Sequence, residues 1–121
     1  MGDGTDFGDL SSTSIHNGGA SSPTRGVFGG IGPSTVTRCD KIEYATFGNG
    51  IDFGDMTVSR NVHAGVSDCV RIAIAGGNVP SARTNVIDYS TFTTGGSFVD
   101  FGDLTDVRSQ LSGGSNGHGG L

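Results

Sequence analysis

Apolar and polar residues alternate over short stretches of this chain, and glycine-rich turns separate the stretches. Residues 42–47 read Ile-Glu-Tyr-Ala-Thr-Phe, so Ile42 and Tyr44 fall on one face of a strand and Glu43 on the other. This alternation is typical of a half-buried β-strand. Two further apolar stretches, R-G-V-F and R-I-A-I-A, each end at a Gly-Gly pair of the kind found in turns. No segment keeps a helical period over a dozen residues, so the pattern predicts an all-β fold.

The sequence Asp-Phe-Gly-Asp (DFGD) occurs three times, beginning at Asp6, Asp52 and Asp100, and indicates an internal repeat. The intervals between the copies are 46 and 48 residues. An arginine recurs between them, and so does the pattern Ile-acid-Tyr-small-Thr-Phe. The structural repeat motif comprises Asp6, Phe7, Gly8, Asp9, Asp52, Phe53, Gly54, Asp55, Asp100, Phe101, Gly102, Asp103, Arg25, Arg71, Tyr44 and Tyr89.

These intervals divide one repeat domain, residues 1–121, into four parts. Residues 1–10 form a lone strand, 11–56 the first repeat, 57–104 the second, and 105–121 a partial third. Four short strands in about 46 residues is the size of one β-propeller blade. The chain is therefore expected to form two complete four-stranded blades with partial strands at both ends, completed by oligomerisation. An open β-rich fibre or solenoid is the alternative.

Charge and composition exclude several classes of protein. The net charge of −5 argues against nucleic-acid binding, which needs a basic face. No run approaches the ~18 apolar residues of a membrane span, so no membrane insertion is expected. The acidic N-terminus lacks the apolar core of a signal peptide. Cys39 and Cys69 are too few for a cysteine zinc site, and either two thiols or one disulfide fits them.

The residues that could take part in catalysis or metal binding favour a structural role instead. DFG occurs in protein kinases, but the other kinase motifs are missing here. Aspartate pairs such as Asp6 and Asp9 could bind calcium, yet a turn or bulge in which they accept backbone hydrogen bonds is preferred. Arg25 and Arg71 are expected to pair with DFGD aspartates, with ligand recognition as the alternative. The histidines, interpreted as solvated or turn residues, are His16, His63 and His118. We therefore expect no enzyme activity, catalytic residue, metal or cofactor.

The amino-acid sequence of the repeat resembles two groups of proteins. Phe-Gly-Gly followed by Tyr44, and Ala-Gly-Gly followed by Tyr89, resemble Kelch repeats, with Phe53 or Phe101 in place of the usual tryptophan. The longer pattern RGVFGG, IEYATF, DFGD and SNGHGGL resembles repeats in structural proteins of tailed phages, especially those of cyanobacteria. This resemblance implies a virion component of a tail, baseplate or fibre, made in the host cytoplasm.

Two blades cannot close a propeller, which needs about four to eight. Exposed sheet edges invite pairing with another chain, so a homo-oligomer is expected, and a trimer would give six blades. The N-terminal DFGD strand is expected to clasp a neighbouring chain. Other virion proteins are the further partners. The alternative function is a receptor- or glycan-binding module that contacts the host surface through the loops 32–38, 78–84 and 93–98.

Overall fold

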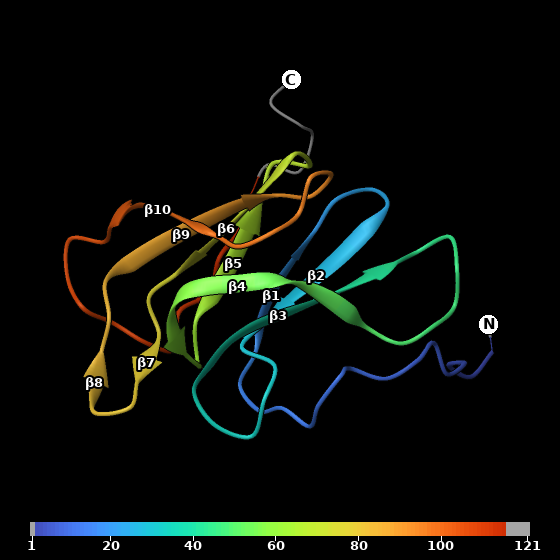
Figure 1. Ribbon diagram of the computed structural model, residues 1–121, viewed down its shortest axis with the longest axis horizontal. Helices are drawn as coiled ribbons and strands as arrows, with labels where there is room; N and C mark the ends of the chain where they lie inside the picture. The colour runs from blue at the N-terminus through green and yellow to red at the C-terminus, as the bar shows by residue number, and fades with distance from the viewer. Residues whose placement is uncertain (1, 116–121) are drawn as a thin grey trace.

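The computed structural model describes residues 2–115, which form two four-stranded antiparallel sheets and a small hairpin (Figure 1). The described residues contain no helix, and the predicted all-β class is confirmed. The first sheet contains β1 (Gly18–Ser21), β2 (Arg25–Gly29), β3 (Val36–Glu43) and β4 (Ile51–Arg60). The second contains β5 (Ala64–Ser67), β6 (Arg71–Ala75), β9 (Val86–Thr91) and β10 (Val99–Asp103). The hairpin pairs β7 (Asn78–Val79) with β8 (Ala82–Arg83).

Both sheets are built by the same path of the chain. Their strand orders are β1-β2-β3-β4 and β5-β6-β9-β10, so each strand pairs with the next long strand. The first turn of each sheet is closed by a side chain that accepts a backbone hydrogen bond. The Ser22 hydroxyl accepts from the N–H of Arg25 (3.1 Å), and the Asp68 carboxylate accepts from the N–H of Arg71 (2.7 Å). These short polar turns explain why the chain reverses after four residues of strand.

The strand register aligns the two sheets differently from the sequence pattern. In the first sheet Asp40 lies opposite Phe28, and in the second Asp88 lies opposite Ile74. Asp40 is therefore the structural equivalent of Asp88, whereas the sequence pattern aligns Glu43 with it. The connection between β6 and β9 accounts for the offset, because it is longer than its counterpart and forms the β7–β8 hairpin.

The same offset separates the two tyrosines of the repeat. The N–H of Tyr44 donates to the carbonyl of Thr24 (2.9 Å), and the N–H of Phe92 donates to the carbonyl of Val70 (3.0 Å). These bonds close equivalent turns, so the structural repeat aligns Tyr44 with Phe92 rather than with Tyr89.

The hydrophobic core lies between the two sheets. β1 contacts β5 at one end of this interface, and a Cβ placed on Gly65 would lie 2.6 Å from the carbonyl oxygen of Gly19. Only glycine permits so close an approach of two backbones. The buried apolar residues of the core are Val27, Cys39, Phe53, Met56, Ile72, Ile74, Phe92 and Phe98. Residues 6–17 lie outside this core and run along the first sheet (Figure 1). They are called the N-terminal arm below.

Residues 2–115 include no helix with the length and apolar character needed to cross a membrane.

Candidate functional site

The three DFGD copies share one local structure. In each, the first aspartate accepts a hydrogen bond from the N–H of the glycine two residues later. The glycine has a φ between +143° and +148°, which L side chains rarely adopt. In β4 and β10 the pairing register shifts at this point, as in a β-bulge. The three pairs are Asp6–Gly8 (3.1 Å), Asp52–Gly54 (3.1 Å) and Asp100–Gly102 (3.0 Å).

The first DFGD copy is covered by the loop that precedes the second copy. The N–H of Gly48 donates to the carbonyl of Phe7 (3.0 Å), and the N–H of Gly50 donates to the carbonyl of Asp9 (2.7 Å). A Cβ on Gly8 would lie 2.3 Å from the oxygen of Gly48. The segment expected to clasp a neighbouring chain therefore contacts its own chain.

The second DFGD copy is covered in the same way by the loop that precedes the third. Gly96 donates to the carbonyl of Phe53 (2.9 Å), and Phe98 donates to the carbonyl of Asp55 (2.8 Å). A Cβ on Gly54 would again lie 2.3 Å from a carbonyl oxygen, that of Gly96. Residues 93–98, one of the loops assigned to the alternative binding function, thus pack against the first sheet, and Phe98 is buried.

The third DFGD copy is open. It lies in β10, the edge strand of the second sheet, and no described strand pairs beyond it. A Cβ on Gly102 would meet nothing within 4 Å. Phe101 is 66% exposed, whereas its counterpart Phe53 is 5% exposed. The ring of Phe101 instead contacts Tyr89 of the same sheet, edge to face, at 5.8 Å between centroids.

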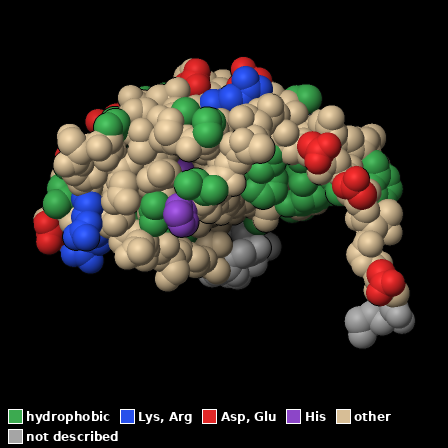
Figure 2. All heavy atoms as spheres, turned by 90° about the horizontal axis from the view of Figure 1, so that it is seen from below, with side chains coloured by type: hydrophobic (Ala, Val, Ile, Leu, Met, Phe, Trp, Pro, Cys, Tyr) green, Lys and Arg blue, Asp and Glu red, His purple; other side chains and the backbone are tan. Residues whose placement is uncertain are grey.

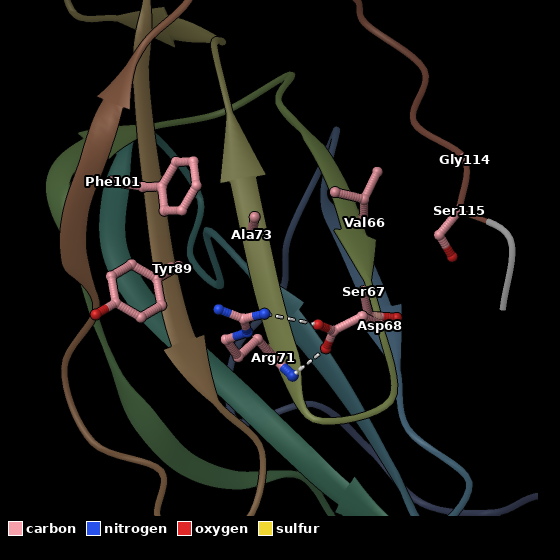
Figure 3. A pocket seen from close by; sticks show the side chains of 9 residues that line it. All are labelled: Val66, Ser67, Asp68, Arg71, Ala73, Tyr89, Phe101, Gly114 and Ser115. Atoms are coloured by element: carbon pink, nitrogen blue, oxygen red, sulfur yellow. Dashed lines mark hydrogen bonds and ion pairs between the residues drawn. The ribbon is translucent and has the colours of Figure 1, made fainter. Parts of the chain in front are cut away.

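A hollow of about 290 Å³ lies beside this open edge (Figure 3). Tyr89 and Phe101 flank it on one side, Ala73 lies at its centre, and Ser115 lies on the other side. The counterpart of Ala73 in the first sheet is Val27, which is fully buried in the core against the second sheet. The hollow therefore occupies the face on which a following sheet would stack.

Arg25 and Arg71 bind acids other than those of DFGD. Arg25 pairs with Glu43 on the neighbouring strand (2.5 Å) and also donates to the carbonyl of Phe92, just after β9 of the second sheet. Arg71 pairs with Asp68, three residues earlier, at 3.1 Å (Figure 3). The expected pairing with DFGD aspartates is wrong. Glu43 lies directly opposite Arg25 in the strand register, and Asp68 closes the turn that precedes Arg71, so these two acids are nearer.

The strongest polar contact between the sheets was not predicted. Arg60, at the end of β4, and Asp88, in β9, form an ion pair of 2.9 Å in which both side chains are 0% exposed. Arg60 also donates to the carbonyls of Val86 (2.7 Å) and Ile74 (3.1 Å), and Asp88 accepts from the N–H and hydroxyl of Thr57. Burial lowers the pKa of Arg60, although Asp88 opposes this effect. The charge is compensated inside the protein, as a buried ion must be.

Asp40 occupies the equivalent position in the first sheet but has different partners. It accepts from the N–H of Ser11 in the N-terminal arm (2.7 Å) and from Nε of Arg38 on its own strand (3.0 Å). The Arg38 side chain is 44% exposed. Burial alone would raise the pKa of Asp40, but hydrogen bonds from Ser11 and Arg38 hold it below its ordinary value. The repeat of a buried acid after 48 residues was the signal that sequence reasoning missed.

His63 is buried, which corrects its interpretation as a solvated residue. Its side chain is enclosed by glycines, and a Cβ on Gly18 or Gly29 would lie within 3 Å of the imidazole. Neither ring nitrogen has a hydrogen-bond partner among the described residues. Burial, aided by the charge of Arg60, lowers the pKa of His63 to about 4. His16 is exposed, and His118 lies outside the described residues.

Neither cysteine forms a disulfide, and their environments differ. Cys39 is fully buried in the core, and burial raises the pKa of its thiol to about 12. Cys69 is half-buried in the β5–β6 turn. Residues 2–115 include no group of three or more side chains that could hold a metal ion.

Neither a protein-family model nor a curated protein matches the chain. The arrangement of its own residues is therefore the basis for any assignment. Within the described residues, that arrangement consists of two equivalent sheets, two covered DFGD copies and one open copy.

Proposed function

We propose that this chain is a structural assembly module of a phage virion, in a tail, baseplate or fibre. Its sheets would stack in series, as the blades of a propeller do. One observation carries the proposal. The first and second DFGD copies each accept backbone hydrogen bonds from the loop that precedes the next copy, and the third copy is open. The placement in a phage rests on the resemblance of the repeat sequence to repeats in structural proteins of tailed phages.

The stacking is directional, which determines the kind of assembly. The first sheet meets the N-terminal arm on one side and the second sheet on the other, so the two ends of the stack differ. Contacts between unlike surfaces give a ring if the rotation closes and a filament if it does not. Three chains with two sheets each would form a ring of six blades, and this is the favoured assembly. An open fibre is the alternative.

The assembly is tested by measuring the mass of the purified chain in solution and imaging it by electron microscopy. We expect a concentration-dependent increase above the 12.2 kDa of one chain, with three chains for the ring and an indefinite series for the fibre. A particle that remains a single chain at every concentration would contradict the proposal.

The hollow beside β10 favours a second candidate function, recognition of a host-surface glycan or receptor. Tyr89 and Phe101 offer apolar ring faces, and the Asp68–Arg71 ion pair lies next to them (Figure 3). Pockets that combine aromatic walls with a few polar groups are typical of ligand sites. A glycan array probed with the wild-type chain and with Tyr89→Ala tests it. Binding that Tyr89→Ala abolishes would support recognition, and no binding by the wild type would contradict it.

A further inference from the structure

Each covered DFGD edge receives its hydrogen bonds from the segment just before another DFGD copy. Gly48 and Gly50 precede Asp52 by four and two residues, and they donate to the first copy. Gly96 and Phe98 precede Asp100 by the same spacing, and they donate to the second copy. The two donors are always two residues apart, and their acceptors are the Phe and the second Asp of DFGD.

A third segment with this spacing precedes the first DFGD copy. Gly2 and Gly4 stand four and two residues before Asp6, in the sequence Gly-Asp-Gly-Thr, which parallels Gly-Asn-Gly-Ile at residues 48–51. Both glycines are exposed, and a Cβ on either would meet nothing within 4 Å. The N-terminal end projects from the body of the protein, with acidic side chains along it (Figure 2). Residues 2–115 thus contain one unused donor segment and one open acceptor edge.

We propose that residues 2–4 of a second copy dock on β10. The N–H of Gly2 would donate to the carbonyl of Phe101, and the N–H of Gly4 to the carbonyl of Asp103. This inference rests on the proposed assembly function and identifies the contact that carries it. Addition of an extended segment to an exposed sheet edge is an established form of recognition, in which main-chain hydrogen bonds supply affinity.

The side chain between the two glycines supports the same alignment. In the covered first copy, Oδ1 of Asn49 accepts a hydrogen bond from the N–H of Asp9 (2.9 Å). Asp3 takes the place of Asn49 in the docking segment, and its carboxylate accepts from the N–H of Asp103. The negative charge of Asp3 lies beside those of Asp103 and Asp100, so Asp3→Asn keeps the acceptor and removes a repulsion.

The aromatic contacts of the motif are also compatible with this partner. Phe7 contacts Phe47 (5.2 Å between centroids), and Phe53 contacts Phe98 (5.9 Å), so each covered copy receives a ring from the covering loop. Residues 2–5 contain no aromatic residue, but Phe101 already contacts Tyr89 of its own sheet. The open edge therefore needs only backbone donors from its partner.

Removal of the two donors tests the inference. Proline has no N–H, so the full chain with Gly2→Pro and Gly4→Pro loses both proposed hydrogen bonds. We expect association to be weaker by about ten-fold or more, measured by sedimentation across a concentration series. Asp3→Asn is the matched variant, and we expect it to strengthen association. Thermal melting of both variants should match the wild type at a concentration at which the wild type is a single chain, because residues 2–4 are exposed and a Cβ on Gly2 or Gly4 would meet nothing within 4 Å.

Disulfide trapping tests the pairing directly. One chain carries Asp3→Cys, a second carries Asp103→Cys, and both carry Cys69→Ser so that the remaining Cys39 is buried. Under mild oxidation we expect a mixed dimer. The control pairs Asp3→Cys with Asp55→Cys, whose edge is covered by Gly96 and Phe98, and we expect little product from it.

The outcomes separate the docking contact from the proposed function. Wild-type assembly with no effect of the proline variant, or trapping no greater than in the control pair, would overturn the docking contact and leave assembly intact. A wild-type chain that never associates would overturn both. Weaker association of the proline variant together with selective trapping at Asp103 would support the inference.

Discussion

The two junctions of this molecule use equivalent acids with different partners. At the junction between the sheets, Asp88 binds Arg60 and Thr57, which both come from β4 of the other sheet. At the junction of the N-terminal arm with the first sheet, Asp40 binds the backbone of Ser11, and its arginine comes from its own strand. A buried charge therefore joins two elements in one case and belongs mainly to one element in the other.

This difference indicates which contacts hold the fold together and which can open. The ion pair between the sheets is fully removed from water. Its loss therefore exposes the core to water or leaves a buried charge without its counter-ion. The N-terminal arm has no arginine at the place of Arg60, because Ser14 stands 46 residues before it. Arg108 stands 48 residues after Arg60 and is exposed, as expected at the open end. The four predictions below test this comparison.

The largest effect is expected for Asp88→Ala. The substitution leaves the Arg60 guanidinium buried without its counter-ion, and we expect a loss of about 3–5 kcal/mol in the free energy of unfolding. Asp40→Ala is the matched control and should lose only about 1–2 kcal/mol, because Arg38 is half-exposed and reaches water. Urea unfolding of both variants measures the difference. Equal losses would contradict the comparison.

The second prediction compares the aromatic residue of two DFGD copies. Phe53→Ala removes a ring that is 5% exposed and packs against Phe98, so we expect a loss of about 3–5 kcal/mol. Phe101→Ala removes a ring that is 66% exposed, and the loss in the single chain should be within about 0.5 kcal/mol. Both values come from denaturant unfolding at low protein concentration. A large loss for Phe101→Ala would show that the third edge is already covered.

Sequence reasoning succeeded where structure depends on local residues. The bulge at DFGD follows from an aspartate that accepts the N–H of the glycine two residues later, and the intervals between copies predicted that β2 is equivalent to β6 and β4 to β10. The all-β class follows from short apolar stretches and turn residues, although the alternating residues 42–47 form a strand only as far as Glu43. These features need no knowledge of which segments meet in space.

Contacts between distant segments could not be predicted in the same way. The similarity of the two Ile-acid-Tyr stretches placed Asp88 against Glu43, because the sequence does not show the extra length taken up by the β7–β8 hairpin. The acid partner of Arg25 depends on the register between β2 and β3, and that of Arg60 depends on how the two sheets stack, so both acids were missed. Residues 93–98 read as a loop, but their backbone donors are used by the neighbouring sheet.

The third prediction concerns pH. His63 has a pKa of about 4 in the folded chain, below its ordinary 6.5, so folding disfavours its protonated form. Its contribution to stability is therefore complete above pH 6.5 and is lost as the pH falls toward 4, by up to about 3 kcal/mol.

Leucine does not titrate, so His63→Leu should flatten this dependence between pH 7 and 5. Leucine is chosen because Leu111 stands at the equivalent place. His16→Asn, at an exposed histidine, is the control and should leave the pH dependence unchanged. The free energy of unfolding at several pH values measures both. If His63→Leu kept the wild-type slope, the buried histidine would not be its cause.

The smallest effect tests the hydroxyl at each junction. Thr57 Oγ1 donates to Oδ1 of Asp88 at 2.6 Å, so Thr57→Val, which keeps the shape of the side chain, should cost about 1–2 kcal/mol. Ser11→Ala changes the corresponding residue of the N-terminal arm, where the backbone N–H still reaches Asp40. We expect a loss below about 1 kcal/mol there, seen as faster hydrogen exchange of the arm rather than global unfolding. Should Ser11→Ala destabilise the whole chain as much as Thr57→Val, the arm would be an integral part of the fold, and the two junctions would be alike in strength.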